Sequence, residues 1–246
     1  MVNGSCVVTG AASGIGAAIA AELAERGWAV VGLDLHPGDG GTEIVIGDVA
    51  DPAAHRSAAD RAAERAPLRG WVNCAGYNIL GSVVELAHAD LVRGIEVDLL
   101  GVFHGTAEAM RRFLTLAAAD RDAAVVNISS IQAAVGFPGF AAYAMAKGGI
   151  EALTRQVAAE YVTEGVRVNA VAPGLVESPM NEAILDPERE ERWRHITPMG
   201  RWAKPREVAK AVAFLLSADA SYITGEVLAV NGGALALAPG QGSRRG

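Results

Sequence analysis

The chain has 246 residues, 51% of them hydrophobic, and its 21 basic and 28 acidic residues give a net charge of −7. This length fits one large α/β domain, and the apolar content excludes global disorder. The acidic balance argues against a nucleic-acid partner, and no apolar run reaches the roughly 18 residues of a membrane span. No basic stretch precedes the first apolar segment, so we expect no signal peptide and a cytoplasmic location. Cys6 and Cys74 are expected to be reduced.

Strand and helix patterns alternate along the chain. Short apolar runs predict buried strands over residues 6–9, 28–33, 43–46, 70–73, 123–129, 166–171 and 227–230. Helical spacing predicts helices over residues 15–26, 52–65, 89–97, 99–118, 142–164 and 205–216. The alternation predicts one α/β domain over residues 1–246, a doubly wound, Rossmann-like parallel sheet with helices on both faces.

A glycine-rich turn joins the first strand to the first helix. Residues 10–16 read GAASGIG, which places Gly10, Gly14 and Gly16 in a variant of the dinucleotide fingerprint GxGxxG. Glycines there let a pyrophosphate approach backbone N–H groups at the positive end of a helix. A merely tight turn is the alternative, but the strand before it and the helix after it favour a dinucleotide site.

The acid that ends the second strand is Asp34. A carboxylate at this place accepts hydrogen bonds from both hydroxyls of an adenosine ribose and repels a 2′-phosphate. Leu35 and His36 follow it, and neither they nor the glycine turn supply Arg or Lys. The pattern therefore favours NAD over NADP, although a protonated His36 would help to bind a phosphate. In the alternative interpretation, Asp34 only caps a loop.

Tyr143 and Lys147 are four residues apart on one expected helix, hence on the same face, and Ser130 follows the fifth strand. Together with the glycine turn, they resemble the short-chain dehydrogenase/reductase family. Further segments that resemble the family lie at residues 48–49, 73–76, 127–130, 169–174 and 225–233. A lone YxxxK pair is weak, because helices carry such pairs by chance on solvated faces. Several motifs in the family's order make the resemblance specific along nearly the whole chain.

The resemblance implies hydride transfer between NAD and a secondary alcohol or ketone. Tyr143 is the implied general acid/base, because the Lys147 ammonium favours its phenolate. Ser130 is expected to hydrogen-bond the substrate oxygen, with Gln132 and Tyr143 also at the substrate. Asp48 is the implied partner of the adenine amino group, with a turn acid as its alternative. The implied cofactor-binding residues are Gly10, Ser13, Gly14, Ile15, Gly16, Asp34, Leu35, Asp48, Val49, Asn73, Ala75, Gly76, Tyr143, Lys147, Pro173, Gly174, Val176 and Ser178.

Three positions depart from the family's pattern. Cys74 replaces an asparagine that commonly ties neighbouring strands together, so we expect a local structural change. Asp98, counted among the catalytic residues, replaces an asparagine whose backbone carbonyl holds a water in a proton relay. We favour survival of that backbone role; alternatively, the carboxylate keeps Lys147 charged. Ser178 replaces a threonine that contacts the nicotinamide carboxamide, and it retains the hydroxyl.

Residues 176–204 interrupt the alternation and are expected to cover the substrate site at the carboxyl ends of the strands. Met180, Trp193 and Trp202 offer apolar surface there or, alternatively, anchor the segment to the core. Tyr77 and Phe137 are candidates for the wall of the pocket. No metal site is predicted.

The resemblance also implies a homo-oligomer, a tetramer or a dimer, formed through the helices near residues 99–118 and 142–164. The expected substrate is a small molecule. Two other functions remain as alternatives: a catalytically silent dinucleotide-binding regulator and an NADPH-dependent ketone reductase. Because a silent relative commonly loses the tyrosine or the lysine, the presence of Ser130, Tyr143 and Lys147 favours the enzyme.

Overall fold

The computed structural model describes residues 4–38, 40–118, 121–182 and 196–236. Within these ranges, seven strands form one parallel sheet in the order β3-β2-β1-β4-β5-β6-β7. The strands are β1 (Ser5–Thr9), β2 (Ala29–Asp34), β3 (Glu43–Ile46), β4 (Leu68–Asn73), β5 (Ala123–Ile128), β6 (Val166–Pro173) and β7 (Val227–Val230). The predicted strands and the Rossmann-like sheet are confirmed.

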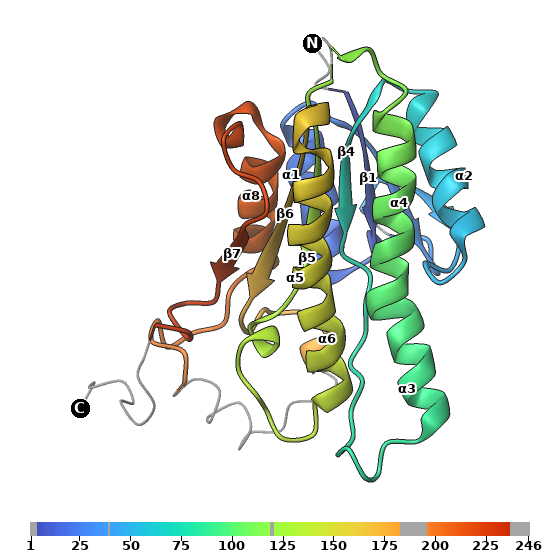
Figure 1. Ribbon diagram of the computed structural model, residues 1–246. Helices are drawn as coiled ribbons and strands as arrows, with labels where there is room; N and C mark the ends of the chain where they lie inside the picture. Colours follow the sequence, from blue (N-terminus) through green and yellow to red (C-terminus); the bar gives the residue numbers. More distant parts are fainter. Residues whose placement is uncertain (1–3, 39, 119–120, 183–195, 237–246) are drawn as a thin grey trace.

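Helices cover both faces of the sheet (Figure 1). They are α1 (Gly14–Glu25), α2 (Pro52–Ala63), α3 (His88–Ile95), α4 (Gly101–Phe113), α5 (Ala141–Tyr161), α6 (Pro179–Glu182) and α8 (Pro205–Leu216). Side chains of α1 and α8 pack in the apolar layer on one face, and those of α2, α4 and α5 in the layer on the other. Successive side chains of a strand point to opposite faces of the sheet. In β1, Cys6 and Val8 pack in the layer of α1 and α8, and Val7 packs in the layer of α2, α4 and α5.

The predicted break between two helices near Asp98 is wrong. A five-residue π-helix, Glu96–Leu100, joins α3 to α4, so the two helices form one column in Figure 1. A wider turn accommodates an extra residue without ending the helix, and such insertions are frequent at functional sites. The second helix also ends at Phe113 rather than near residue 118.

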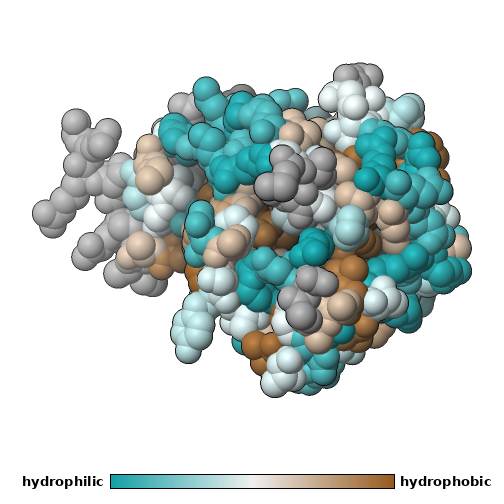
Figure 2. Space-filling model, turned by 90° about the horizontal axis from the view of Figure 1, so that it is seen from above, coloured by the Kyte–Doolittle hydropathy of each residue, from teal (hydrophilic) through white to brown (hydrophobic). Residues whose placement is uncertain are grey.

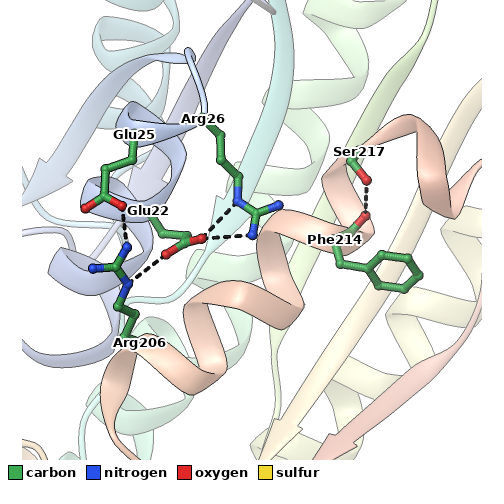
Figure 3. A network of polar contacts seen from close by, with 6 residues as sticks. All are labelled: Glu22, Glu25, Arg26, Arg206, Phe214 and Ser217. Carbon is green, nitrogen blue, oxygen red and sulfur yellow. Dashed lines mark hydrogen bonds and ion pairs between the residues drawn. The ribbon is translucent and has the colours of Figure 1, made fainter.

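An ion network joins α1 to α8 (Figure 3). The buried Glu22 carboxylate accepts hydrogen bonds from Arg26, at 2.9 Å, and from Arg206 of α8, at 3.0 Å. Arg206 also pairs with Glu25. Burial raises the pKa of Glu22, but the two guanidinium groups outweigh burial and hold the pKa below its usual value. The network therefore stabilises the packing of α1 on α8 near neutral pH.

Figure 2 shows the molecule from above, at the end opposite the carboxyl ends of the strands. Hydrophilic residues predominate there, and the hydrophobic ones lie in small, separated groups. Among the described residues, no helix is both long and apolar enough to cross a membrane. Cys6 and Cys74 are both free thiols, as predicted.

Candidate active site

A cavity of about 470 Å³ lies at the carboxyl ends of the strands, on the lower side of Figure 1. β1 lies between β2 and β4, so the strand order reverses here, and open α/β sheets bind ligands at such a point. The structure thus brings together segments from much of the chain. The predicted residues that line the cavity are Gly10, Ser13, Gly14, Ile15, Gly16, Asp34, Leu35, Asp48, Val49, Ala75, Gly76, Ser130, Gln132, Tyr143, Lys147, Pro173, Gly174, Val176 and Ser178.

The glycine turn forms one wall of the cavity. Gly10 has a φ of +70°, and a methyl group added there would lie 2.8 Å from Ala75 Cα. A methyl group on Gly16 would lie 1.9 Å from the carbonyl oxygen of Gly10, so a side chain cannot be accommodated. Ser13 is the N-cap of α1 but its side chain makes no capping hydrogen bond. The first N–H groups of α1 therefore receive no hydrogen bond from the Ser13 side chain. Because free N–H groups at a helix N-terminus bind anions, the turn is suited to a pyrophosphate.

Asp34 is fixed by backbone groups on both sides. Its Oδ2 accepts a hydrogen bond from the Ala12 N–H at 3.0 Å, and its Oδ1 accepts one from the His36 N–H at 3.1 Å. The carboxylate does cap the loop. Because a carboxylate has about four lone-pair sites, it can still accept hydrogen bonds from a ribose. The capping and ribose-binding interpretations are therefore compatible.

Asp48 is engaged by the protein itself. Its Oδ1 accepts a hydrogen bond from the Ala50 N–H at 2.9 Å, and its Oδ2 pairs with Nη2 of Arg93 at 2.5 Å. Arg93 also lines the cavity, and sequence reasoning missed it. Arg93 lies one helical turn before Val97, which also lines the cavity, so the two side chains share one face of the helix. This spacing is the sequence pattern that could have identified Arg93.

Asn73 is not among the residues that line the cavity, and its assignment to the cofactor stays a prediction. Its side chain is buried, accepts a hydrogen bond from Trp71 Nε1 at 2.8 Å, and donates to Thr106 Oγ1 at 3.1 Å and to Asn127 Oδ1 at 2.8 Å. Asn127 in turn donates to Thr154 Oγ1 at 2.9 Å. We call these five residues the amide cluster. The cluster ties β4 to β5, α4 and α5.

The structural change expected at Cys74 stays a prediction. The parallel pairing of β4 continues to Val72 opposite β1 and to Asn73 opposite β5, directly before Cys74. The register shift between β1 and β4 lies at the other end of β1, between Ser5 and Cys6. It is Asn73 that ties β4 to β5 through a side chain. The backbone N–H groups of Cys74 and Ala75 donate to Thr9 Oγ1 at 2.9 and 3.0 Å, which joins β4 to β1. Cys74 lines the cavity, and burial raises the pKa of its thiol to about 12. The thiol therefore remains protonated at neutral pH.

Tyr143, Lys147 and Ser130 meet in the cavity. The first two share one face of α5, and Lys147 Nζ lies 5.3 Å from the centre of the Tyr143 ring. Lys147 is buried and donates to the Ile128 carbonyl at 3.3 Å. Ser130 follows β5, and its Oγ accepts a hydrogen bond from the Gln132 N–H at 3.2 Å. The arrangement brings a phenol, an ammonium and a hydroxyl to one place.

The electrostatics of the site favour a neutral phenol beside a charged lysine. Burial raises the pKa of Tyr143, while Lys147 lowers it, Asp98 raises it and Ser130 lowers it, and the net shift is upward. Burial lowers the pKa of Lys147, but the Tyr143 phenolate, when it forms, and the Asp98 carboxylate outweigh burial, so the pKa of Lys147 is raised. Lys147 therefore stays an ammonium in the working pH range and can stabilise a phenolate when one forms.

Asp98 lies in the π-helix, fully buried and behind the lining residues of the cavity. Its Oδ1 accepts a hydrogen bond from the Tyr77 N–H at 2.9 Å. Its Oδ2 is buried and has no hydrogen-bond partner within the described part of the chain. Burial raises the pKa of this carboxyl, while Lys147 and the Tyr77 N–H lower it, and the net shift is upward.

The substrate side of the cavity carries Gln132, whose Oε1 is buried and has no partner among the residues that the structure describes. Tyr77 also lines this side, as predicted. Phe137, the other residue predicted there, does not line the cavity, but Phe140 does. The ring of Phe140 is edge-on to the ring of Tyr143, and the two ring centres are 6.3 Å apart. Phe140 is the residue directly before α5, so the start of the helix determines this wall.

Residues 176–204, which are expected to cover the substrate site, are described by the structure except for residues 183–195. Leu175, Val176, Ser178, Pro179, Met180 and Asn181 line the cavity, which supports the predicted position of its first part. Asn78 donates to the Met180 carbonyl at 3.1 Å and attaches α6 to the loop after β4. Trp193 and the rest of residues 183–195 lie outside the described residues. Trp202 is described and partly buried, and residues 176 and 203 form a bridge.

Known proteins resemble this chain along nearly its whole length. Residues 10–234 match the family described as enoyl-(acyl carrier protein) reductase. The chain is 42% identical over 244 residues to cis-4-hydroxycyclohexanecarboxylate dehydrogenase of Sinomonas cyclohexanicum, a match that covers 94% of this chain and 96% of that protein.

Two solved structures share the fold along nearly the whole chain. The aldohexose dehydrogenase of Thermoplasma acidophilum has a TM-score of 0.89 and 33% identity, covering 98% of this chain and 97% of its own. A protein from Agrobacterium tumefaciens, provisionally assigned as a 2-deoxy-D-gluconate 3-dehydrogenase, has bound NADP. Its TM-score is 0.88 and its identity 32%, covering 96% of this chain and 98% of its own.

The chain belongs to the short-chain dehydrogenase/reductase family. It is accordingly an oxidoreductase that transfers a hydride between a nicotinamide dinucleotide and an alcohol or ketone. The predicted family is confirmed, and the predicted reaction is confirmed at this level.

Proposed function

We propose that this protein is an NAD-dependent dehydrogenase of secondary alcohols, with Tyr143 as its general acid/base. The observation that carries the proposal is the convergence of Tyr143, Lys147 and Ser130 in a cavity that also contains the glycine turn and Asp34. The glycine turn would hold the pyrophosphate, Asp34 the adenosine ribose, and Lys147 the nicotinamide ribose. When bound, the cofactor supplies the hydride acceptor or donor.

The chain's own residues handle the proton. Ser130 holds the substrate oxygen against the Tyr143 hydroxyl, so the proton has a short path between them. In alcohol oxidation, the Tyr143 phenolate accepts the alcohol proton; in ketone reduction, the phenol returns it. Because the pKa of Tyr143 is raised, oxidation should accelerate as pH rises, and reduction should be faster at lower pH. Lys147 keeps its charge and stabilises the phenolate in either direction.

The preference for NAD rests on Asp34. Its carboxylate is held in place by two backbone N–H groups, and a fixed negative charge there opposes a 2′-phosphate. Among the residues that the structure describes, the cationic side chains that line the cavity are Arg93 and Lys147, and Arg93 is paired with Asp48. The similar protein from Agrobacterium tumefaciens has bound NADP, whereas Asp34 favours NAD here, so the choice between NAD and NADP is tested directly.

The cofactor experiment compares kcat/KM for NAD and NADP in wild type, Asp34→Ala and His36→Ala. We expect wild type to prefer NAD and Asp34→Ala to narrow the ratio by about 10–100-fold, because charged hydrogen bonds are worth about 1.5–3 kcal/mol. His36→Ala tests the alternative that a protonated imidazole helps to bind the 2′-phosphate; if it does, the preference for NAD should increase in this variant. A wild-type preference for NADP would reject the argument and favour the NADPH-dependent ketone reductase.

We infer a substrate with a second polar group in addition to the reacting hydroxyl. The buried Oε1 of Gln132 needs a hydrogen-bond donor, and a substrate hydroxyl would supply one. The relatives named for a hydroxylated cyclohexane acid and for an aldohexose support this class. A panel of cyclic and polyhydroxylated secondary alcohols, read as NADH absorbance, tests both substrate and activity. No turnover with either cofactor, with NADH binding intact, would favour the silent dinucleotide-binding regulator.

We also propose a cytoplasmic homo-oligomer, a tetramer or a dimer. Leu100, Phe103 and Met145 lie on the helical column and on α5, and their side chains are 42%, 52% and 55% exposed. Apolar side chains of this size on neighbouring helices support association with a second copy. Light scattering during size-exclusion chromatography would give the mass, and a monomer at micromolar concentration would reject the proposal.

A further inference from the structure

Asp98 is a buried carboxylate with one satisfied and one unsatisfied oxygen. Its side chain is 0% exposed, Oδ1 is held by the Tyr77 N–H, and Oδ2 has no partner within the described residues. A buried carboxylate is costly unless a charge or hydrogen bonds compensate it. A merely structural residue at this position would serve better as an amide or an apolar side chain, so the carboxylate calls for a functional explanation.

The compensating charge is Lys147, and the geometry around Gly76 places the two groups together. A methyl group added to Gly76 would lie 2.9 Å from Asp98 Oδ1 and 3.5 Å from Lys147 Nζ. Both charged ends therefore border the same small space beside the Gly76 backbone. The Lys147 ammonium donates a long hydrogen bond, 3.3 Å, to the Ile128 carbonyl, and because an ammonium has three donors it retains others for further partners.

The other groups around Asp98 are mainly neutral or already paired. From α5 it faces Lys147 and Tyr143, and from the loop after β4 it faces Tyr77. Cys74, a protonated thiol, interacts with Lys147 rather than with Asp98. Arg93, on the α3 side, is engaged by Asp48. The first residues of α4, at 101–103, are not titratable. The nearby charge that balances Asp98 is thus the lysine that also serves the tyrosine.

We propose that Asp98 is a positioning residue whose negative charge, beside Lys147 and Tyr143, sets the pH range in which Tyr143 accepts the substrate proton. The inference rests on the proposed function, because it concerns the same proton transfer. It assigns the role to the side chain, in contrast to the backbone role favoured from sequence alone. The negative charge of Asp98 also opposes the phenolate, so the residue biases Tyr143 towards the phenol.

The test is Asp98→Asn, which keeps the shape and an acceptor for the Tyr77 N–H but removes the charge. Without that charge, the pKa of Tyr143 should fall, because a nearby negative charge disfavours a phenolate. The alkaline rise of kcat/KM for alcohol oxidation should move to lower pH by at least about one unit. An amide also mimics a protonated carboxyl. Superimposable profiles would therefore mean that Asp98 is neutral or inactive in the wild type, and would overturn the proposal.

A second measurement is independent of any substrate. The phenolate absorbance of Tyr143 is obtained as the difference between a protein and the same protein with Tyr143→Phe, titrated with pH in the wild-type and Asp98→Asn backgrounds. The midpoint should fall in the Asp98→Asn background, and an unchanged or higher midpoint contradicts the proposal. If no alcohol is oxidised but this midpoint falls, the proposed function fails while the role of Asp98 stands.

Two further variants control the experiment. Glu151→Gln makes the same carboxylate-to-amide change one turn after Lys147, where Glu151 accepts a hydrogen bond from Ser129 at 3.0 Å, and it should leave the Tyr143 midpoint unchanged. Asp98→Ser replaces Asp98→Asn if the latter does not fold, and the same downward displacement is expected. An equal displacement in Glu151→Gln would show a general charge effect and would also overturn the proposal.

Discussion

The amide cluster and the catalytic residues both include residues at β5 and on α5, yet the polar atoms of the two groups differ in how fully they are hydrogen-bonded. Asn127 lies on β5 and Thr154 on α5, and both are buried and fully hydrogen-bonded. Ser130 follows the same strand and Lys147 lies on the same helix, but nearby groups such as Asp98 Oδ2 have no hydrogen-bond partner within the described part of the chain. The satisfied hydrogen bonds make the amide cluster rigid. The unsatisfied groups near the catalytic residues remain free to bind the substrate or to exchange a proton with it.

The largest expected effect is on the reactive side of this comparison. Tyr143→Phe should reduce turnover by about 10²–10⁴-fold, the typical contribution of general acid/base catalysis. NADH binding and the thermal midpoint should change little, since the hydroxyl acts on the substrate proton. Turnover, NADH fluorescence titration and thermal unfolding are measured in parallel. Tyr161→Phe, on the same helix but outside the lining residues, is the control and should be as active as wild type.

The amide cluster should respond to mutation in the opposite way. Asn127→Leu removes an acceptor for Asn73 and a donor to Thr154, so buried polar groups lose partners. We expect the free energy of unfolding to fall by about 2–4 kcal/mol, since each unsatisfied group costs about 1–3 kcal/mol. Urea unfolding gives this value. Activity per folded molecule should fall much less than for Tyr143→Phe; an unchanged stability would show that the cluster contributes only packing.

The ion network of α1 and α8 should give the smallest effect, because Arg26 and Arg206 are partly exposed and water screens their charges. Glu22→Gln should lower the free energy of unfolding by about 1 kcal/mol at pH 7. The pKa of Glu22 is lowered in the folded protein, so this contribution is present above the ordinary carboxyl pKa and is lost as pH falls through the folded value. The difference between the proteins should therefore vanish in acid.

The control for that experiment is Glu25→Gln, whose side chain is 55% exposed and which should cost less than Glu22→Gln. Urea unfolding of the three proteins across acidic and neutral pH gives both results. A difference for Glu22→Gln that grows as pH falls would contradict the expected pH dependence. The network would then stabilise the fold by packing alone.

The sequence was sufficient for the parts that depend on periodicity and on short motifs. Apolar runs located the strands, and the spacing of Tyr143 and Lys147 placed both on one face of α5. The glycine turn was recognisable because Gly16 has no room for a side chain. These features depend on local chain geometry, which a linear pattern records.

The sequence was insufficient where side chains choose partners across the fold. Asn73 belongs to a motif beside the cavity, but its side chain faces Trp71 and Asn127 instead. Arg93 of α3 lines the cavity beside Asp48, with which it pairs although the two residues are 45 positions apart in the chain. The π-helix at Asp98 depends on one extra residue in the turn, which leaves no periodic signal. Each of these outcomes is decided by contacts between segments distant in the chain.

The order of the strands also has a consequence for how the enzyme becomes active. Thr9 Oγ1 accepts hydrogen bonds from the N–H groups of Cys74 and Ala75, which lie 65 and 66 residues further along the chain. These contacts form only when the chain between them has closed into a long loop. Parallel pairing requires such long closures, and long-range contacts slow folding. During refolding, helix should be recovered early, while dinucleotide binding waits for β1 and β4 to join. Chains arrested before that step expose strand edges, so yield after dilution from denaturant should decline as protein concentration rises.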